Sequence, residues 1–150
     1  MKQKLLNATP DIAFFGAIIG AFLLDRFIPV AGFIESPFCY VGWLLAVIGG
    51  VLATKSLALL RKRASSDVER TSHVLITDNL FRFSRNPLYF SELLVVVGVA
   101  VALGSLAAFA APIVYVIIVG LAVISYEENQ LRKKFGAKYE AYVRSVRRWI

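Results

Sequence analysis

The fold is decided by residues 88–125, LYFSELLVVVGVAVALGSLAAFAAPIVYVIIVGLAVIS, in which Glu92 carries the only formal charge. A bilayer core about 30 Å thick takes about 20 helical residues to cross. The stretch is too long for one span and has the right length for two spans joined by a tight turn. Pro112 is the predicted turn, because proline disrupts a continuing helix. We therefore predict spans over residues 88–109 and 112–126.

Two further apolar blocks lie upstream, over residues 12–30 and 38–60. Asp25 and Arg26 follow the first apolar run where a cleaved signal peptide would have small residues, so we interpret this block as a retained span. Lys55 interrupts the second block. The prediction is an all-α integral membrane bundle of about four transmembrane helices, forming a single domain over residues 1–150.

The composition supports a membrane location. Hydrophobic residues make up 58% of the chain and charged residues 18%, with a mean hydropathy of +0.68, and a soluble domain of this size rarely carries so much apolar side chain. The net charge of +7 in such a chain indicates contact with anionic membrane lipids and argues against nucleic acid as a partner. The oligomeric state stays open.

Basic residues are concentrated in two segments, a predicted loop over residues 61–86 and the tail from residue 127 onward. The members are Arg61, Lys62, Arg63, Arg70, Arg82 and Arg85 in the loop, and Arg132, Lys133, Lys134, Lys138, Arg144, Arg147 and Arg148 in the tail. The links around Glu35 and Pro112 carry no lysine or arginine. Because positive charge is retained on the cytoplasmic side, we predict a multi-pass protein with both termini in the cytoplasm.

The tail over residues 127–150 has a helical period. Apolar or aromatic residues recur at spacings of three and four, at Leu131, Phe135, Tyr139, Tyr142 and Val146. This pattern predicts a C-terminal amphipathic helix lying on the membrane interface, bent at Gly136. Glu128 with Arg132, and Glu140 with Arg144, have the favourable i,i+4 spacing of ion pairs.

The segment before residue 88 has the features of a helix start. Asn86 is a favoured N-cap and Pro87 a favoured first helical residue. The free amides at that helix end, beside Arg85, could hold a carboxylate or phosphate. The alternative is a plain capped helix with arginines that extend to the headgroups.

Glu127 and Glu128 are adjacent acids where the fourth predicted span reaches the same surface. One interpretation is surface charge balance, and the other is an anionic spot for a cationic ligand. A ligand with a carboxylate at one end and a positive centre at the other could bridge this pair and the helix start. S-adenosylmethionine has those features.

Soluble-enzyme signatures are absent. The chain has no G-x-G-x-x-G and no P-loop, and its only histidine, His73, has no partner at metal-ligand spacing, so the sequence predicts no metal site. Gly16 and Gly20 form a G-x-x-x-G in the first span, which predicts close helix packing within the bundle.

Several segments together carry a family resemblance: HVLIT at 73–77, RNPLY at 85–89, the pair Glu127–Glu128, FGAKYEAY at 135–142 and VRR at 146–148. In this order they resemble the isoprenylcysteine carboxyl methyltransferase and phospholipid methyltransferase superfamily of integral membrane enzymes. The resemblance implies an S-adenosylmethionine site lined by His73, Leu75, Ile76, Phe81, Asn86, Pro87, Leu88, Tyr89, Glu127 and Glu128. The family usually has histidine where this chain has Asn86.

The resemblance implies an S-adenosylmethionine-dependent methyltransferase that takes a lipophilic acceptor from the bilayer. The acceptor would be the carboxylate of a prenylated cysteine or, alternatively, the amine of a phospholipid headgroup. Arg85 and Glu92 are the predicted catalytic residues, Arg85 to orient an anionic acceptor and Glu92 because it lies three residues past Tyr89 on a helix. Two alternatives remain: Glu92 as a polar anchor paired with an arginine, and a non-catalytic protein that binds lipid or supports assembly.

Overall fold

The computed structural model describes residues 2–28, 37–69 and 75–150, with side chains at 9–28, 37–62 and 75–150. The described residues fold into helices, which confirms the all-α prediction. The elements are α1 (Lys2–Phe27), α2 (Phe38–Glu69), η1 (Asn79–Arg82), α3 (Pro87–Leu103), η2 (Ala107–Phe109), α4 (Ala110–Ile118), η3 (Val119–Ile124), α5 (Ser125–Phe135) and α6 (Ala137–Ser145).

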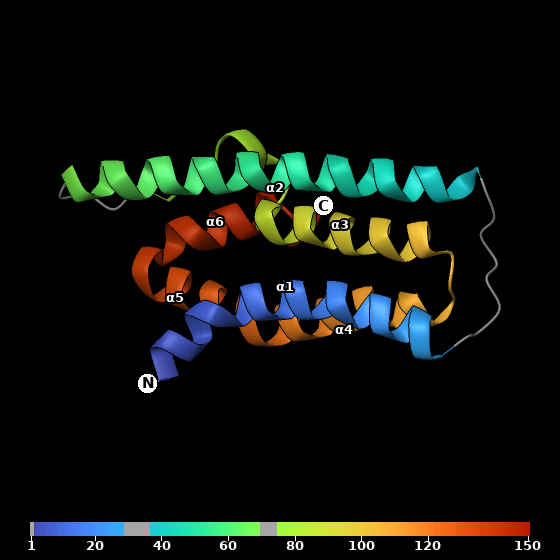
Figure 1. Cartoon of the computed structure of the whole chain (residues 1–150). Coiled ribbons are helices and arrows are strands. Elements are labelled where there is room, and N and C mark those ends of the chain that lie inside the picture. The colour runs from blue at the N-terminus through green and yellow to red at the C-terminus, as the bar shows by residue number, and fades with distance from the viewer. Residues whose placement is uncertain (1, 29–36, 70–74) are drawn as a thin grey trace.

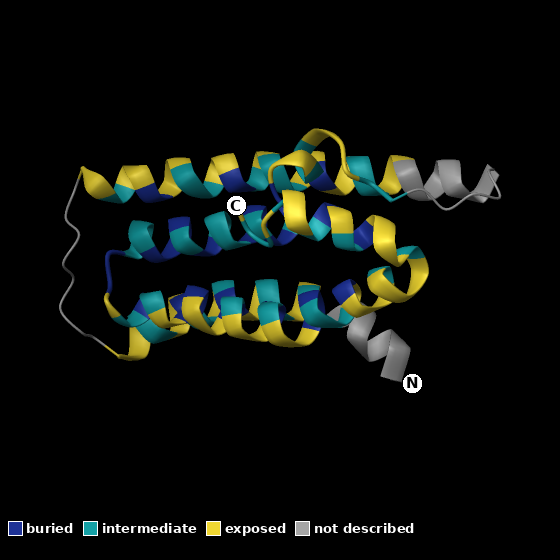
Figure 2. Ribbon diagram, turned by 180° about the vertical axis from the view of Figure 1, so that it is seen from behind, coloured by how far each residue is buried: buried dark blue, intermediate teal, exposed yellow. Residues whose placement is uncertain are grey.

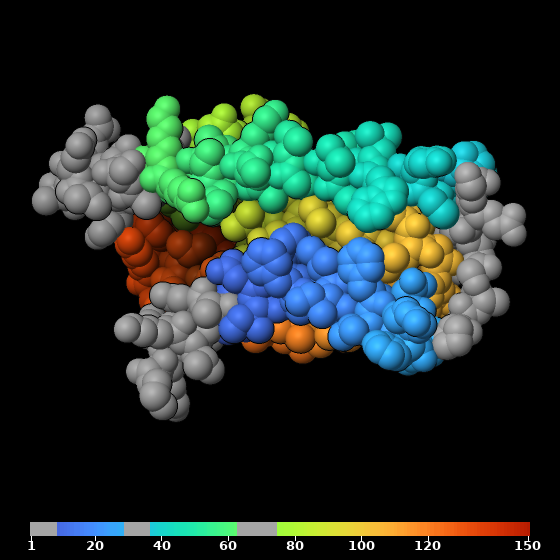
Figure 3. Space-filling model, in the orientation of Figure 1, coloured from blue at the N-terminus to red at the C-terminus, as the bar shows by residue number. Residues whose placement is uncertain are grey.

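The long helices lie side by side, with α3 between α2 on one side and α1 and α4 on the other (Figure 1). In Figure 3, atoms of α3 are visible between α2 and α1. α3 is mainly buried or half-buried, whereas the outer faces of its neighbours are exposed (Figure 2). The core therefore forms around α3, and Val96 of α3 belongs to the same buried cluster as Tyr115 and Val119 of the α4–η3 rod.

Glycines set the close contact between α2 and α3. A Cβ atom on Gly42 would lie 2.3 Å from the Ala102 backbone nitrogen, and one on Gly98 would lie 2.5 Å from the Ala46 nitrogen. Two turns after Gly42 along α2, toward the site, a Cβ on Gly49 would lie 2.8 Å from the Ser91 carbonyl oxygen. Only glycine permits this backbone approach, which is the usual means of packing helices in lipid.

Among the described residues, two helices are long and apolar enough to cross a membrane, Phe38–Lys62 and the continuous rod Ala107–Phe135; Pro87–Leu103 is a shorter apolar helix. Large hydrophobic side chains face outward on the bundle, among them Phe15 at 60%, Leu44 at 60% and Ile113 at 61% exposed. A water-soluble protein rarely exposes so continuous an apolar surface. These features indicate an integral membrane protein.

The predicted turn at Pro112 is wrong. α3 ends at Leu103, and Gly104 adopts the left-handed conformation (φ 69°) that glycine tolerates best. Pro112 lies in the first turn of α4, where its missing N–H leaves no helical hydrogen bond unmade. The span predicted over 88–109 is therefore a helix that ends earlier, at Leu103. The span predicted over 112–126 is part of a longer rod that begins earlier, at Ala107, and runs to Phe135.

Other predicted boundaries also shift. α1 begins well before residue 12 and ends at Phe27, and the end predicted at residue 30 lies outside the described residues. α2 continues past residue 60 to Glu69, because lysine and arginine end an apolar span without ending a helix. The tail is not one helix over 127–150: Gly136 (φ 51°) separates α5 from α6, and α6 ends at Ser145.

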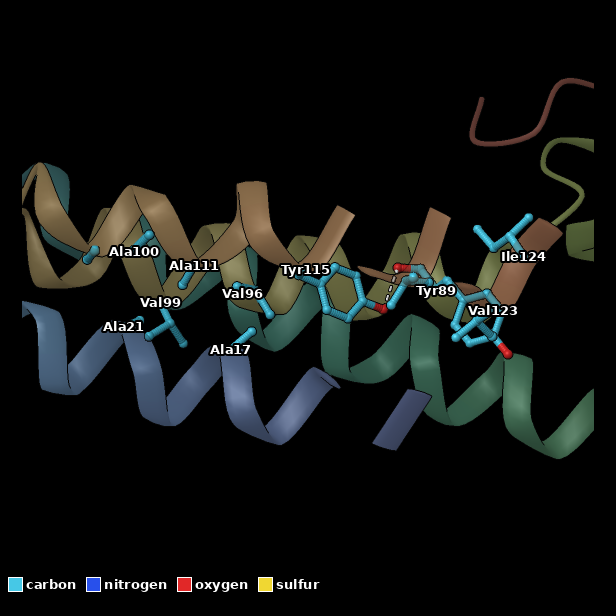
Figure 4. Packing of buried hydrophobic residues seen from close by; sticks show 12 residues of the cluster. Ala17, Ala21, Tyr89, Val96, Val99, Ala100, Ala111, Tyr115, Val123 and Ile124 are labelled. Atoms are coloured by element: carbon cyan, nitrogen blue, oxygen red, sulfur yellow. Dashed lines mark hydrogen bonds between the residues drawn. The ribbon is translucent and has the colours of Figure 1, made fainter. Parts of the chain in front are cut away.

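The G-x-x-x-G of α1 does not pack as predicted. A Cβ on Gly16 or Gly20 would meet no described atom within 4 Å. The close packing of α1 uses the neighbouring Ala17 and Ala21 instead, which belong to the buried core (Figure 4). The two glycines line an apolar groove between α1 and α4.

We predict opposite effects of the same substitution at two adjacent glycines of α2. Gly49→Ala should lower the free energy of unfolding by about 1–3 kcal/mol, because its methyl group overlaps the α3 backbone. Gly50→Ala should leave stability unchanged or raise it by up to about 1 kcal/mol, since its Cβ position is open and alanine favours helix. Unfolding by dodecyl sulfate in detergent micelles measures both, and equal destabilisation by the two variants would contradict the glycine contact.

Candidate active site

A cavity of about 420 Å³ lies at one end of the bundle, enclosed by the segment before α3, the start of α3, α5 and α6. In Figure 1 these elements gather at the end where α1 begins. The cavity is lined by every predicted cofactor-binding residue whose side chain is described: Leu75, Ile76, Phe81, Asn86, Pro87, Leu88, Tyr89, Glu127 and Glu128. Arg85 lines it as well, and His73 lies outside the described residues.

The apolar stripe of the tail also faces this cavity. Its lining includes Leu131, Phe135, Tyr139 and Tyr142, four of the five residues that predicted a helix lying on the membrane. Tyr139 and Tyr142 are almost fully buried. The stripe therefore serves burial against the site, and contact with lipid is not needed to explain it.

Tyr142 fixes the wall of the cavity opposite α3. Its hydroxyl donates a hydrogen bond to the Phe81 carbonyl oxygen at 2.6 Å. Burial raises the pKa of Tyr142 to about 12, so the hydroxyl stays protonated and remains a donor at neutral pH. This bond connects α6 to η1.

The start of α3 follows the predicted pattern, with one difference. Asn86 is at the N-cap position and Pro87 is the first helical residue, but the Asn86 side chain makes no capping bond. Its Nδ2 donates instead to the Arg148 carbonyl oxygen at 3.0 Å. The amide is thus used to hold the tail, and the backbone N–H of Asn86 is satisfied by the Ser84 hydroxyl at 3.1 Å.

The chain after α6 returns to this segment. The Arg85 backbone N–H donates to the Arg147 carbonyl oxygen at 3.0 Å, and Trp149 packs against the core cluster. The sequence interpretation placed residues 146–150 in a surface helix and missed this return. The signal available was a tryptophan directly after two arginines in a polar tail, since tryptophan favours a buried position with a polar edge.

Glu128 lies between two guanidinium groups. The Arg148 side chain donates two hydrogen bonds to its carboxylate, at 3.1 and 2.6 Å, and Arg85 Nη1 lies 3.2 Å from Glu128 Oε1. The predicted ion pairs Glu128–Arg132 and Glu140–Arg144 are both wrong. Arg132 instead pairs with Glu140, at 3.0 Å. Glu128 is 7% exposed, so it is a structural carboxylate and not a surface charge.

The adjacent Glu127 has a different environment. Its Oε1 accepts a hydrogen bond from the Tyr89 hydroxyl at 2.7 Å, and no arginine or lysine pairs with it among the described residues. On the other side, Arg85 is 10% exposed, and its Nε and Nη1 donate no hydrogen bond within the described part of the chain. The cavity thus has a carboxylate that pairs with no cation among the described residues, and a buried guanidinium whose Nε has no acceptor while its Nη1 lies in the ion pair with Glu128.

Glu92 does not line the cavity. Its Oε2 lies 2.7 Å from the Tyr115 hydroxyl, which is also 3.3 Å from the Tyr89 carbonyl oxygen (dashed in Figure 4). The partner of Glu92 is therefore a tyrosine and not an arginine. Glu92 reaches the site only through Tyr115 and the backbone of Tyr89.

A π-helical turn leads into the two acids. η3 (Val119–Ile124) lies between α4 and α5, and the Ser125 hydroxyl donates to the Gly120 carbonyl oxygen five residues earlier at 2.9 Å. A π turn inserts one extra residue into a helix and is frequent at functional sites. It rotates the following turn, so that Glu127 and Glu128 both line the cavity.

The sequence matches the family model described as phospholipid methyltransferase over residues 37–138. The chain belongs to this family. The matched region includes the start of α3 and both acids of the cavity and ends before Tyr139 and Arg148, so the returning tail lies outside it. An uncharacterized protein of Haemophilus influenzae is 33% identical over 63 residues, which cover 42% of this chain and all of that protein. No solved structure matches the chain.

The burial of the Glu128 carboxylate makes a testable difference. In a double-mutant cycle with Glu128→Gln and Arg148→Gln, we expect a coupling energy of about 1–3 kcal/mol, because Arg148, itself 38% exposed, makes two hydrogen bonds to a carboxylate that is only 7% exposed. The matched control is Glu140→Gln with Arg132→Gln, a pair of similar length whose side chains are both 46% exposed. Its coupling should stay below about 1 kcal/mol. Unfolding in detergent gives all values, and equal couplings would show that Glu128 is not a structural carboxylate.

Proposed function

We propose that this family member is an S-adenosylmethionine-dependent methyltransferase that methylates a lipophilic acceptor from the bilayer. One observation carries the proposal: the cavity in the family-matched region holds Glu127, which pairs with no cation among the described residues, and Arg85, whose buried Nε has no acceptor there. A ligand with both a cationic and an anionic end complements these two groups.

The residues present fit S-adenosylmethionine. Glu128 is neutralised by two arginines, so Glu127 is the carboxylate left for the ammonium or sulfonium. Arg85 is the donor for the cofactor carboxylate. Leu75, Ile76, Phe81 and Phe135 provide apolar surface for the adenine ring. A volume of about 420 Å³ is within the usual range for cofactor sites, about 300–1,000 Å³.

The cofactor supplies a methyl group on a positively charged sulfur. The protein needs to orient the acceptor and exclude water, which accelerates a displacement without an acid or base. Tyr89 holds the Glu127 carboxylate in place. Glu92 then acts as a positioning residue, because it does not reach the cavity and holds the Tyr115 hydroxyl, which lies 3.3 Å from the Tyr89 carbonyl oxygen.

The proposed topology places this site at the cytoplasmic surface. We propose that α1 and α3 cross the membrane together with the two candidate spans, giving four spans with both termini in the cytoplasm. The support is the distribution of charge: the basic segments before α3 and after η3 lie at the cavity end of the bundle, and lysine and arginine are retained on the cytoplasmic side.

Two acceptor classes are proposed. The carboxylate of a prenylated cysteine is favoured by Lys134, a second cation in the cavity lining beside Arg85, which is assigned to the cofactor carboxylate. The amine of a phospholipid headgroup is favoured by the family description, phospholipid methyltransferase. Both are lipophilic molecules that would enter from the bilayer.

Calorimetry on the detergent-purified protein tests cofactor binding. We expect wild-type protein to bind S-adenosylmethionine, and Glu127→Gln to weaken the affinity about ten-fold, since a charge-assisted hydrogen bond is lost. Tyr89→Phe should weaken it about three-fold. Glu140→Gln is the matched control, because it removes the same charge from an exposed position beyond the cavity. Absence of binding at millimolar cofactor, or equal losses in Glu127→Gln and the control, contradicts the proposal.

A transfer assay then selects the acceptor. Protein in lipid nanodiscs is incubated with the methyl-labelled cofactor and either a bacterial lipid extract or a prenylcysteine analogue. Label in the prenylcysteine ester supports the carboxylate, and label in the phospholipid fraction supports the amine. Cofactor binding without transfer to either class would favour a non-catalytic lipid-binding protein.

A further inference from the structure

A second cavity of about 480 Å³ lies between the outer face of α2 and η1. Figures 1 and 2 both show the segment that contains η1 arching over α2. Its lining includes Lys55, Ala58, Leu59 and Lys62 from α2 and Leu80 and Phe83 from the arch. It shares no lining residue with the candidate active site, and the methyl-transfer proposal makes no use of it.

Two lysines face this cavity from one side of α2. Lys55 and Lys62 are seven residues apart, which is two helical turns or about 10 Å along the axis. Ala58 and Leu59 lie between them on the same face, and the small side chain of Ala58 leaves room there. A single anionic group bound over Ala58 is thus within reach of both flexible ammonium groups.

Lys55 needs an explanation in a membrane protein. It lies within the candidate span Phe38–Lys62 and is exposed on the helix surface. Among the described residues no carboxylate pairs with it, and the hydroxyl groups of Thr54 and Ser56 bond their own helix. A lysine at such a position extends its ammonium toward the headgroup region.

The arch provides an apolar surface opposite the lysines. Asn79 has a positive φ of 55°, a conformation that asparagine tolerates better than most residues, and it begins the 3-10 turn that brings Leu80 and Phe83 over α2. Phe83 is 73% exposed. Aromatic side chains at the interface contact the junction between headgroup and acyl chain.

From this arrangement we propose that the cavity under η1 binds an anionic phospholipid, with its phosphate between Lys55 and Lys62 and an acyl chain along Leu59 and Phe83. Cationic side chains on one wall and apolar side chains on the other complement a molecule that is anionic at one end and apolar at the other. This lipid is a bound partner and not the methyl acceptor, because the site lies outside the active cavity.

Native mass spectrometry of the purified full chain tests the site, with added phosphatidylglycerol or phosphatidylcholine as probes. Wild-type protein should retain phosphatidylglycerol in preference to phosphatidylcholine. Lys55→Gln should lower that preference about five-fold, the effect of one lysine near an anionic lipid. Ala58→Phe should lower it too, because it fills the cavity without changing charge. Lys133→Gln is the control, since it removes one exposed lysine from α5.

Three results would overturn the proposal: equal retention of the two lipids, an equal loss in Lys55→Gln and Lys133→Gln, or displacement of phosphatidylglycerol by millimolar inorganic phosphate. The last result would mean that the phosphate alone is recognised. A Phe83→Trp variant places a reporter in the cavity. Its fluorescence, corrected for wild-type protein, should be quenched more by brominated phosphatidylglycerol than by brominated phosphatidylcholine, and equal quenching contradicts the site.

Discussion

The buried carboxylate of Glu128 is the interaction on which the site depends. It joins three segments that are distant in sequence: α5, the chain before α3 through Arg85, and the returning tail through Arg148. A charge taken out of water is costly unless it is paired and hydrogen-bonded. Removing Glu128 would therefore leave two guanidinium groups without their shared carboxylate, and the three segments would lose the group that joins them.

That pairing gives two adjacent acids different roles. Glu128 has a structural role, because it pairs with two guanidinium groups. Among the described residues, Glu127 accepts a hydrogen bond from a neutral donor, the Tyr89 hydroxyl, and its carboxylate has no cationic partner. The two guanidinium groups around one carboxylate also leave one positive charge in excess, at Arg85. Both arginines thus pair with Glu128 and neither pairs with Glu127. This difference gives the cavity the two opposite charges that the proposed ligand requires.

Local sequence patterns predicted the parts of the fold that depend on neighbouring residues. The start of α3 at Pro87 and the apolar face of the tail follow from capping preferences and helical period. The turn was misplaced because Gly104 and Pro112 both interrupt an apolar stretch, and only tertiary context decides between them. The Asn86–Arg148 bond joins residues 62 positions apart, so no local pattern could indicate it. The prediction that Asn86 and Tyr89 line the cavity rested on the family resemblance and not on a local pattern.

The membrane explains why the polar network and the glycine contacts occupy different parts of the bundle. Lipid offers no hydrophobic gain for helix association, so α2 and α3 associate through the close backbone approach at Gly42 and Gly98. This close approach leaves no space for a polar cavity between the two helices. Charged groups are also costly within the hydrocarbon region. The cavity therefore forms where α3 begins, and Tyr89 lines it from the helix that the glycine contacts join to α2.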